Sequence, residues 1–131
     1  MQKQAITTEK APASIGPYST AVRCGDWVFL SGQIALPPTD QGGASLVSAE
    51  IAGQTHQVFK NLSAVVQASD GKLSDIVKLN IYLTDLENFS VVNEIMNEIF
   101  DEPYPARATV EVSALPKGAL VEIDAIMCCN K

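Results

Sequence analysis

The sequence predicts an α+β fold in which a mixed sheet of about six strands carries two helices on one face. Two segments repeat apolar residues every three to four positions, which is typical of helices that bury one side. A third segment, residues 75–84, alternates apolar and polar side chains, which is typical of a strand with two different faces. Helices packed on one face of a sheet satisfy both patterns.

Length and composition limit the class of protein. A chain of 131 residues is expected to form one domain, residues 1–131. Hydrophobic residues make up 47% of the chain, yet no apolar run approaches the ~20 residues of a membrane-spanning helix. The first residues lack the apolar core and cleavage site of a secretory signal. A cytoplasmic protein that does not enter the membrane is therefore expected.

Charge and cysteine content argue against two further classes. The net charge is −6 and Lys and Arg do not cluster, so a nucleic-acid partner is disfavoured. Three cysteines, Cys24, Cys128 and Cys129, form no framework spacing and are expected to be reduced, small apolar side chains. The one histidine, His56, is far in sequence from all of them, which argues against a metal site.

The N-terminal part predicts strands around a rigid loop. A short first strand ends within residues 6–10, and two prolines and a glycine make residues 11–18 a loop that can hold Tyr18 in place. Residues 19–24 and 27–34 then read as a hairpin joined by Gly25-Asp26. Gly32 lies inside the second of these strands, where a glycine often marks a close approach of backbone or ligand.

Two helices follow from capping residues and apolar stripes. Ser48 is expected to cap the first helix, which ends near Gly71. Asp85 is expected to cap the second, which Pro103 terminates. The stripes are Ile51, Val58, Leu62, Val65 and Val66 in the first helix and Phe89, Val92, Met96, Ile99 and Phe100 in the second.

The last two strands, residues 107–112 and 120–128, flank Leu115-Pro116-Lys117-Gly118 and read as a second hairpin. A turn centred on that segment places Thr109 opposite Asp124 and Glu111 opposite Glu122. With residues 75–84, where Val77, Leu79, Ile81 and Leu83 share the apolar side, one sheet face is then apolar. The other face is polar and carries Lys78, Asn80, Tyr82, Arg107, Thr109, Glu111, Glu122 and Asp124. No third helix is available to cover it, so it faces water or another subunit, either solvated or organised for function.

Arg107 enters a largely apolar strand directly after Tyr104-Pro105-Ala106. Its guanidinium stays charged and presents a planar fork that matches a carboxylate or phosphate. The residue is therefore either a ligand clamp or one half of an interfacial ion pair with Glu111 or Glu122.

Several segments in order resemble a known family. They are residues 11–19 (APASIGPYS), 29–34 (FLSGQI), 104–107 (YPAR) with 110–112 (VEV), 115–117 (LPK) and 121–125 (VEIDA). Together they resemble the signature segments of the RidA (reactive intermediate deaminase A) or YjgF-type proteins, and the resemblance runs essentially from end to end.

The resemblance implies a chorismate-mutase-like fold and a homotrimer with a central barrel and ligand pockets between subunits. It implies hydrolysis of 2-imino acids or their enamine tautomers, such as 2-iminobutanoate and 2-iminopropanoate, to 2-keto acids and ammonia. Pyridoxal-phosphate-dependent dehydratases release these substrates, and the family protects cells from them. The reaction itself requires no cofactor or metal, since the imine carbon is already electrophilic.

The resemblance also assigns roles to individual residues. Arg107 matches the arginine that grips the substrate carboxylate, assisted by the backbone of Gly32. Tyr18 matches the aromatic residue that lines the pocket, and Ser31 lies beside it. Glu122 matches the glutamate that holds the hydrolytic water.

Alternatives remain open for these residues, because Glu122 also fits a solvated strand residue, Tyr18 a loop-packing aromatic and Ser31 a small packing residue. Thr109 stands where many deaminating members carry cysteine. Its backbone is expected to preserve the contact made there, while its hydroxyl alters water placement or substrate range.

A non-catalytic module that binds small carboxylates and regulates a partner also fits Arg107. An endoribonuclease or translation inhibitor is the third alternative, and the acidic charge argues against it.

Overall fold

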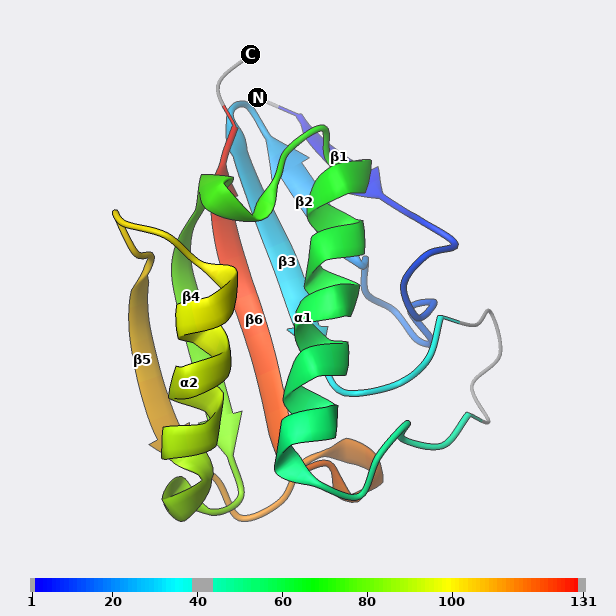
Figure 1. The fold of residues 1–131 in the computed structure, drawn as a ribbon. Helices are drawn as coiled ribbons and strands as arrows, with labels where there is room; N and C mark the ends of the chain where they lie inside the picture. The colour runs from blue at the N-terminus through cyan, green and yellow to red at the C-terminus, as the bar shows by residue number, and fades with distance from the viewer. Residues whose placement is uncertain (1, 39–43, 130–131) are drawn as a thin grey trace.

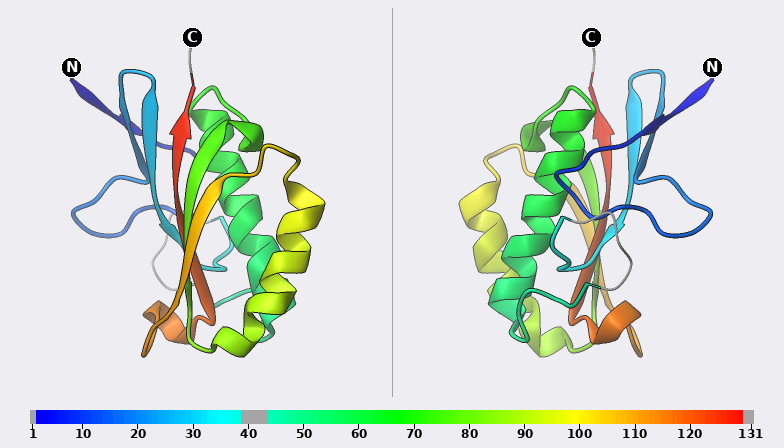
Figure 2. Two further views of the ribbon diagram at one scale, coloured as in Figure 1. Left: turned by 90° about the vertical axis from the view of Figure 1, so that its left-hand side faces the viewer. Right: turned by 90° about the vertical axis from the view of Figure 1, so that its right-hand side faces the viewer.

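A computed structural model describes residues 2–38 and 44–129 of the chain, and it confirms the α+β class. Six strands form one sheet in the order β1-β2-β3-β6-β4-β5, and helices α1 and α2 pack on one side of it (Figures 1 and 2). Among the strands of the described residues, only β4 and β5 pair in parallel. The elements are β1 (Lys3–Ile6), β2 (Ala21–Cys24), β3 (Trp27–Gln33), α1 (Ile51–Ala68), β4 (Ile76–Leu83), α2 (Phe89–Ile99), β5 (Ala106–Glu111) and β6 (Val121–Cys128).

The first predicted hairpin is confirmed. Strands β2 and β3 pair antiparallel with Cys24 opposite Trp27, so Gly25 and Asp26 form the turn. Gly25 has φ of +63°, a conformation that a side chain disfavours, and this explains why the glycine comes first in the pair.

The second predicted hairpin is wrong, because β5 and β6 are not neighbours. Strand β4 lies between them and pairs with β5 in parallel and with β6 antiparallel. The physical reason is that α2 acts as the crossover which a parallel β4-β5 pair requires. Strand β6, with alternate residues fully buried, takes a central position, whereas β5 lies at the sheet edge.

This change of topology also corrects the predicted polar face. Arg107, Thr109 and Glu111 lie opposite Leu79, Ile81 and Leu83 of β4, which are fully buried under the helices. Side chains at paired positions point to the same face, so these three residues belong to the helix side. The polar residues of β4 and β6, namely Lys78, Asn80, Tyr82, Glu122 and Asp124, do share the opposite side, which we call the open face.

The alternation predicted for residues 75–84 is also broken at one end. Ile76 pairs with Met127 and Lys78 with Ile126, so Val77 is an extra residue that bulges from the pairing. Before the bulge, the residues that face the core are therefore the even-numbered ones. Ile76 is 4% exposed, whereas Val77, predicted on the apolar side, is 41% exposed.

The helices lie where they were predicted, with different caps. The N-cap of α1 is Glu50, whose backbone N–H donates to Ser48 Oγ at 3.0 Å, so Ser48 stabilises the turn before the helix. Asp85 accepts a hydrogen bond from the backbone of Glu87 at 2.9 Å and caps a short 3₁₀ turn that continues into α2. Helix α2 ends at Ile99, before Pro103.

The core lies between the helices and the sheet. Phe59 of α1 packs edge-on against Phe100 after α2, with ring centroids 5.7 Å apart. Burial of one such ring stabilises the fold by about 1.5–3 kcal/mol. Met96 is buried as core filler, as predicted.

The three cysteines are free, and Cys129 donates its thiol to the backbone oxygen of Asp70 at 3.3 Å.

Neither α1 nor α2 covers the open face (Figure 2). Large apolar side chains are exposed there. Trp27, Phe29 and Val110 are 45%, 48% and 47% exposed. Exposed apolar groups that lie along one sheet surface are typical of a face that contacts another protein surface. Across residues 2–38 and 44–129, neither helix combines the length and apolar composition needed to cross a bilayer.

Candidate functional site

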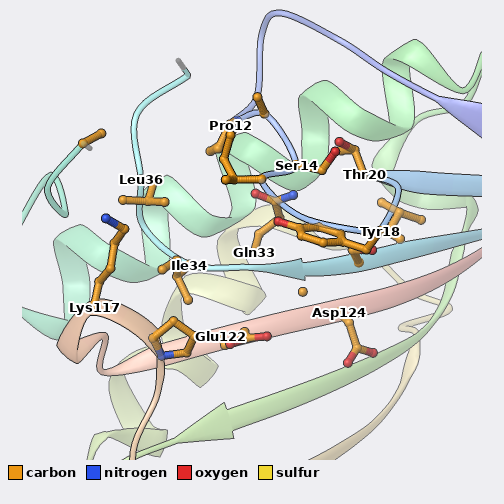
Figure 3. A pocket seen from close by; sticks show the side chains of 17 residues that line it. Pro12, Ser14, Tyr18, Thr20, Gln33, Ile34, Leu36, Lys117, Glu122 and Asp124 are labelled. Atoms are coloured by element: carbon orange, nitrogen blue, oxygen red, sulfur yellow. The ribbon is translucent and has the colours of Figure 1, made fainter. Parts of the chain in front are cut away.

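A cavity of about 720 Å³ opens on the open face, between the loop after β1, the end of β3 and the start of β6 (Figure 3). Four of the predicted site residues line it: Tyr18 from the loop, Ser31 and Gly32 from β3, and Glu122 from β6. Arg107 and Thr109 do not line it. The structure therefore brings together one part of the predicted site and leaves the other part elsewhere.

Glu122 lies directly over Gly32. A Cβ built on Gly32 would stand 2.1 Å from Glu122 Oε2, which is far inside any real contact. A close approach at Gly32 is confirmed, but the group that approaches is the Glu122 carboxyl and not a backbone or ligand. A glycine at this position therefore lets the carboxyl lie against the backbone of β3.

The surroundings of Glu122 favour its protonated form. Partial burial removes water from the carboxyl, and the neighbouring charge of Asp124 adds to this, so the pKa of Glu122 is raised above its ordinary value. None of the hydrogen bonds found among the described residues engages the Glu122 side chain. Its carboxyl is thus a proton-accepting group that remains available inside a cavity.

Asp124 is held by two side chains of β4. Asn80 Nδ2 donates to Asp124 Oδ1 at 2.7 Å, and the Tyr82 hydroxyl donates to Asp124 Oδ2 at 2.9 Å. This hydrogen bond, more than burial, raises the pKa of Tyr82 and keeps its hydroxyl protonated. Two polar residues of the open face, Asn80 and Tyr82, are therefore oriented by Asp124.

The loop side of the cavity is fixed by hydrogen bonds at its base. Ser31 Oγ donates to the backbone oxygen of Ser19 at 2.6 Å, and the Ser31 backbone N–H donates to Thr20 at 3.0 Å. The Tyr18 N–H donates to the Gly16 oxygen at 2.9 Å, and the Tyr18 ring lies near Gly16. The ring itself is 54% exposed, so it forms an outer wall of the cavity and is not packed into the loop.

Arg107 lies at the other edge of the sheet, against α2. Its Nη1 is 2.7 Å from Asn93 Oδ1 and 3.6 Å from Met96 Sδ, and its Cζ is 4.8 Å from the centroid of the Phe89 ring. Glu111 instead accepts a hydrogen bond from the Leu86 backbone at 3.0 Å. Among the described residues no carboxylate pairs with Arg107, so neutral groups orient a guanidinium whose charge is available.

Thr109 follows Arg107 on the same side of β5, opposite Ile81. Its hydroxyl oxygen is buried and has no hydrogen-bond partner among the described residues. A buried hydroxyl without a partner costs roughly 1–3 kcal/mol. Within one chain, therefore, Thr109 belongs with Arg107 and contributes nothing to the cavity.

One chain presents two separate parts of the predicted site. The cavity half consists of Tyr18, Ser31, Gly32 and Glu122, and the arginine half consists of Arg107 and its partners on α2. Strand β4 separates β5 from β6, which places the two backbones about 10 Å apart across the sheet. The side chains also point to opposite faces.

Comparison with known proteins identifies the family. A family model described as Endoribonuclease L-PSP matches residues 8–129. A 2-iminobutanoate/2-iminopropanoate deaminase of Dermatophagoides farinae is 45% identical over 125 residues, which cover 95% of each chain. The chain belongs to the RidA/YjgF/L-PSP family.

Solved structures of RidA/YjgF/L-PSP proteins have the same fold. RidA from the Antarctic bacterium Psychrobacter is 46% identical, with a TM-score of 0.89 over 95% of this chain and 98% of that one. TdcF of Escherichia coli, solved with bound serine, is 36% identical, with a TM-score of 0.88 over 97% of this chain and 99% of that one. The resemblance detected in the sequence is confirmed at the level of the family and of the fold.

Sequence reasoning missed the residues that support Arg107. Phe89 and Met96 were interpreted only as part of an apolar stripe, and Asn93 was not singled out. Phe89, Asn93 and Met96 recur at helical spacing, so they share one helix surface. This spacing points to a support for Arg107 only when β5 is known to lie beside α2. In the described part of the chain, no group of three His, Cys, Asp or Glu residues is placed to hold a metal ion.

Proposed function

We propose that this protein hydrolyses reactive 2-imino acids and their enamine tautomers, such as 2-iminobutanoate and 2-iminopropanoate, to 2-keto acids and ammonia. The observation that carries the proposal is the Glu122 carboxyl, which lies in an open cavity against Gly32 with a raised pKa. The 45% identical relative named as a deaminase supports the same chemistry.

Imine hydrolysis requires only a positioned water and a proton acceptor from the cavity half. A protonated imine has an electrophilic carbon, so water can attack it once a base removes a proton. Glu122 accepts that proton as the C–O bond forms and returns it to the nitrogen. The C–N bond then breaks while the remaining hydroxyl proton passes to Glu122 and on to solvent, which leaves the keto oxygen. The products are a 2-keto acid and ammonia. Tyr18 and Ser31 line the space in which the imine is held.

Arg107 is proposed to bind the substrate carboxylate through its planar fork. Asn93 and Phe89 hold the guanidinium on one side, which leaves its remaining donors for a ligand. The Gly32 backbone is proposed to assist from the cavity half. Because Glu122 and Arg107 lie on opposite sides of one sheet, a complete site needs the cavity half of one chain and the arginine half of another.

Such an assembly is proposed to be a homotrimer with sites between its subunits. The exposed Trp27, Phe29 and Val110 on the open face support it, since a second copy would remove them from water. Thr109, with its unpartnered hydroxyl beside Arg107, would then lie near the same boundary.

The direct test is semicarbazone formation from 2-iminobutanoate that a threonine dehydratase generates, compared among wild type, Arg107→Ala and Glu122→Ala. Wild type is expected to speed conversion to the keto acid, and both variants are expected to lose most of that effect. A wild type equal to the no-protein control would refute the deaminase proposal. Loss in Arg107→Ala but not in Glu122→Ala would overturn the role given to Glu122.

A second candidate is a non-catalytic module that binds small carboxylates. The relative solved with bound serine favours it, because serine carries the same carboxylate next to a nitrogen-bearing carbon. Calorimetry of 2-ketobutanoate and serine binding to wild type and to Glu122→Gln separates the candidates. A module that only binds retains its ligand in both proteins and shows no turnover in either.

A further inference from the structure

Asp124 lies in the cavity wall next to Glu122 and has no role in the proposed reaction so far. It is half-buried and accepts two hydrogen bonds, from Asn80 at 2.7 Å and from the Tyr82 hydroxyl at 2.9 Å. Both donors come from β4, the strand adjacent to β6. Two donors on one carboxylate hold it in one orientation.

The strand register places this group beside Glu122. Glu122 and Asp124 are two positions apart on β6, so they point to the same face with backbones about 7 Å apart. Tyr82 lies opposite Glu122 and Asn80 lies opposite Asp124 in the β4-β6 pairing. The Tyr82 backbone therefore lies opposite Glu122, and its side chain reaches diagonally to the carboxylate of Asp124.

We propose that Asp124, held by Asn80 and Tyr82, is a positioning residue that acts through Glu122 and keeps the Glu122 carboxyl a strong enough base to take a proton from water. The proposal rests on the hydrolytic function proposed above. In this proposal Asp124 acts through Glu122 and not by contact with the imine. Its negative charge makes a second negative charge at Glu122 unfavourable, so Glu122 holds a proton more readily.

Burial and the charge of Asp124 both raise the pKa of Glu122, with burial the larger cause. The other elements around the cavity contribute few titratable groups: Tyr18 from the loop and Lys117 from the turn before β6, with Tyr82 on β4. The part of β3 that lines the cavity has no ionisable side chain. A base is more effective when its pKa lies closer to the working pH, so Asp124 is placed to increase the rate.

Two variants and a matched control test this. Asp124→Asn removes the charge and preserves the shape, and Tyr82→Phe removes one hydrogen bond to Asp124. Glu98→Gln removes an exposed charge on α2, far from the cavity. Carbon-13 NMR follows titration of the Glu122 carboxyl in the free protein, with its signal assigned from Glu122→Gln. The pH dependence of kcat and KM follows catalysis.

The midpoint of the Glu122 titration is expected to fall in Asp124→Asn, to fall less in Tyr82→Phe, and to stay unchanged in Glu98→Gln. The acid limb of kcat should move to lower pH in the same order, and kcat of Asp124→Asn should drop roughly three- to tenfold with KM nearly constant.

An unchanged Glu122 midpoint in both cavity variants would overturn the proposal even if wild type is an active deaminase. A midpoint that falls while the acid limb of kcat stays in place would overturn the catalytic role. Wild type without activity would refute the proposed function instead, and the NMR titration would still decide whether Asp124 controls Glu122.

Discussion

The cavity half and the arginine half are built in different ways. The cavity half joins a rigid loop, β3 and the central strand β6, and its carboxyl lies against a glycine in partial burial. The arginine half lies at the sheet edge, where an exposed guanidinium rests on one helix through an amide and an aromatic ring. The cavity half thus raises the pKa of a carboxyl, and the arginine half holds an exposed guanidinium in one orientation.

This difference suggests how work is divided within the site. A carboxyl with a raised pKa matters mainly when bonds to water form and break, which affects kcat. An oriented guanidinium binds the carboxylate in the ground state and in the transition state alike, which affects KM. The two halves should therefore respond differently to mutation.

The largest expected effects come from removing the central group of each half. Glu122→Gln should lower kcat by about 10²- to 10⁴-fold with little change in KM, because the proposed general base is lost. Arg107→Ala should lower kcat/KM by about 10²-fold or more, mainly through KM, because two charge-assisted hydrogen bonds are lost. Steady-state kinetics on 2-iminobutanoate measures both.

Glu111→Gln is the matched control, since it removes a carboxylate from the same strand as Arg107 and should leave both parameters within about twofold. If Glu122→Gln raised KM and spared kcat, the two halves would not divide the work in this way.

A smaller effect is expected from Gly32→Ala, which tests the contact within the cavity half. The added Cβ would meet the end of the Glu122 side chain, so the carboxyl moves while the fold is retained. We expect kcat to fall roughly tenfold and the thermal midpoint to change little.

Gly118→Ala provides the opposite pattern. Gly118 has φ of +72° and no neighbour within 4 Å of an added Cβ, so this variant should lose about 1 kcal/mol of stability and keep its kcat. Equal losses of activity in the two variants would show that Gly32 has no particular relation to Glu122.

The smallest effect is expected from Asn93→Ala, which removes the amide that orients Arg107. The Phe89 ring still supports the guanidinium, so KM should rise only about three- to tenfold with kcat nearly unchanged. Asn97→Ala, at an exposed position of the same helix, is the control and should match wild type. A loss in kcat without a change in KM would contradict the role given to Asn93.

Local signals in the sequence predicted most of the fold. The stripes of α1 and α2, the turn at Gly25 and the close approach at Gly32 all depend on nearby residues or on one glycine, and the structure confirms them. The predicted N-cap of α1 was Ser48, and the observed N-cap is Glu50, two residues later. The Ser48 hydroxyl accepts a hydrogen bond from the Glu50 backbone in the turn before the helix, which is a local contact that serine also favours.

Long-range pairing was the part that the sequence did not reveal. A proline-glycine turn between residues 107–112 and 120–128 favours a hairpin locally, yet β4 lies between those strands. The pairing depends on α2 crossing over from β4 to β5, which is a property of the whole sheet. The error in pairing placed Arg107 on the polar face with Glu122, whereas in the structure Arg107 lies on the helix side.

Mixed assemblies test most directly whether one working site takes its two halves from different chains. Arg107→Ala and Glu122→Gln chains carrying different tags would be coexpressed, assemblies holding both tags purified, and their deaminase activity compared with each parent and with wild type. In a closed trimer that holds both tags, one of the three sites joins an intact cavity half to an intact arginine half, so about a third of wild-type activity should return. Mixed assemblies no more active than the two inactive parents would contradict a site shared between chains.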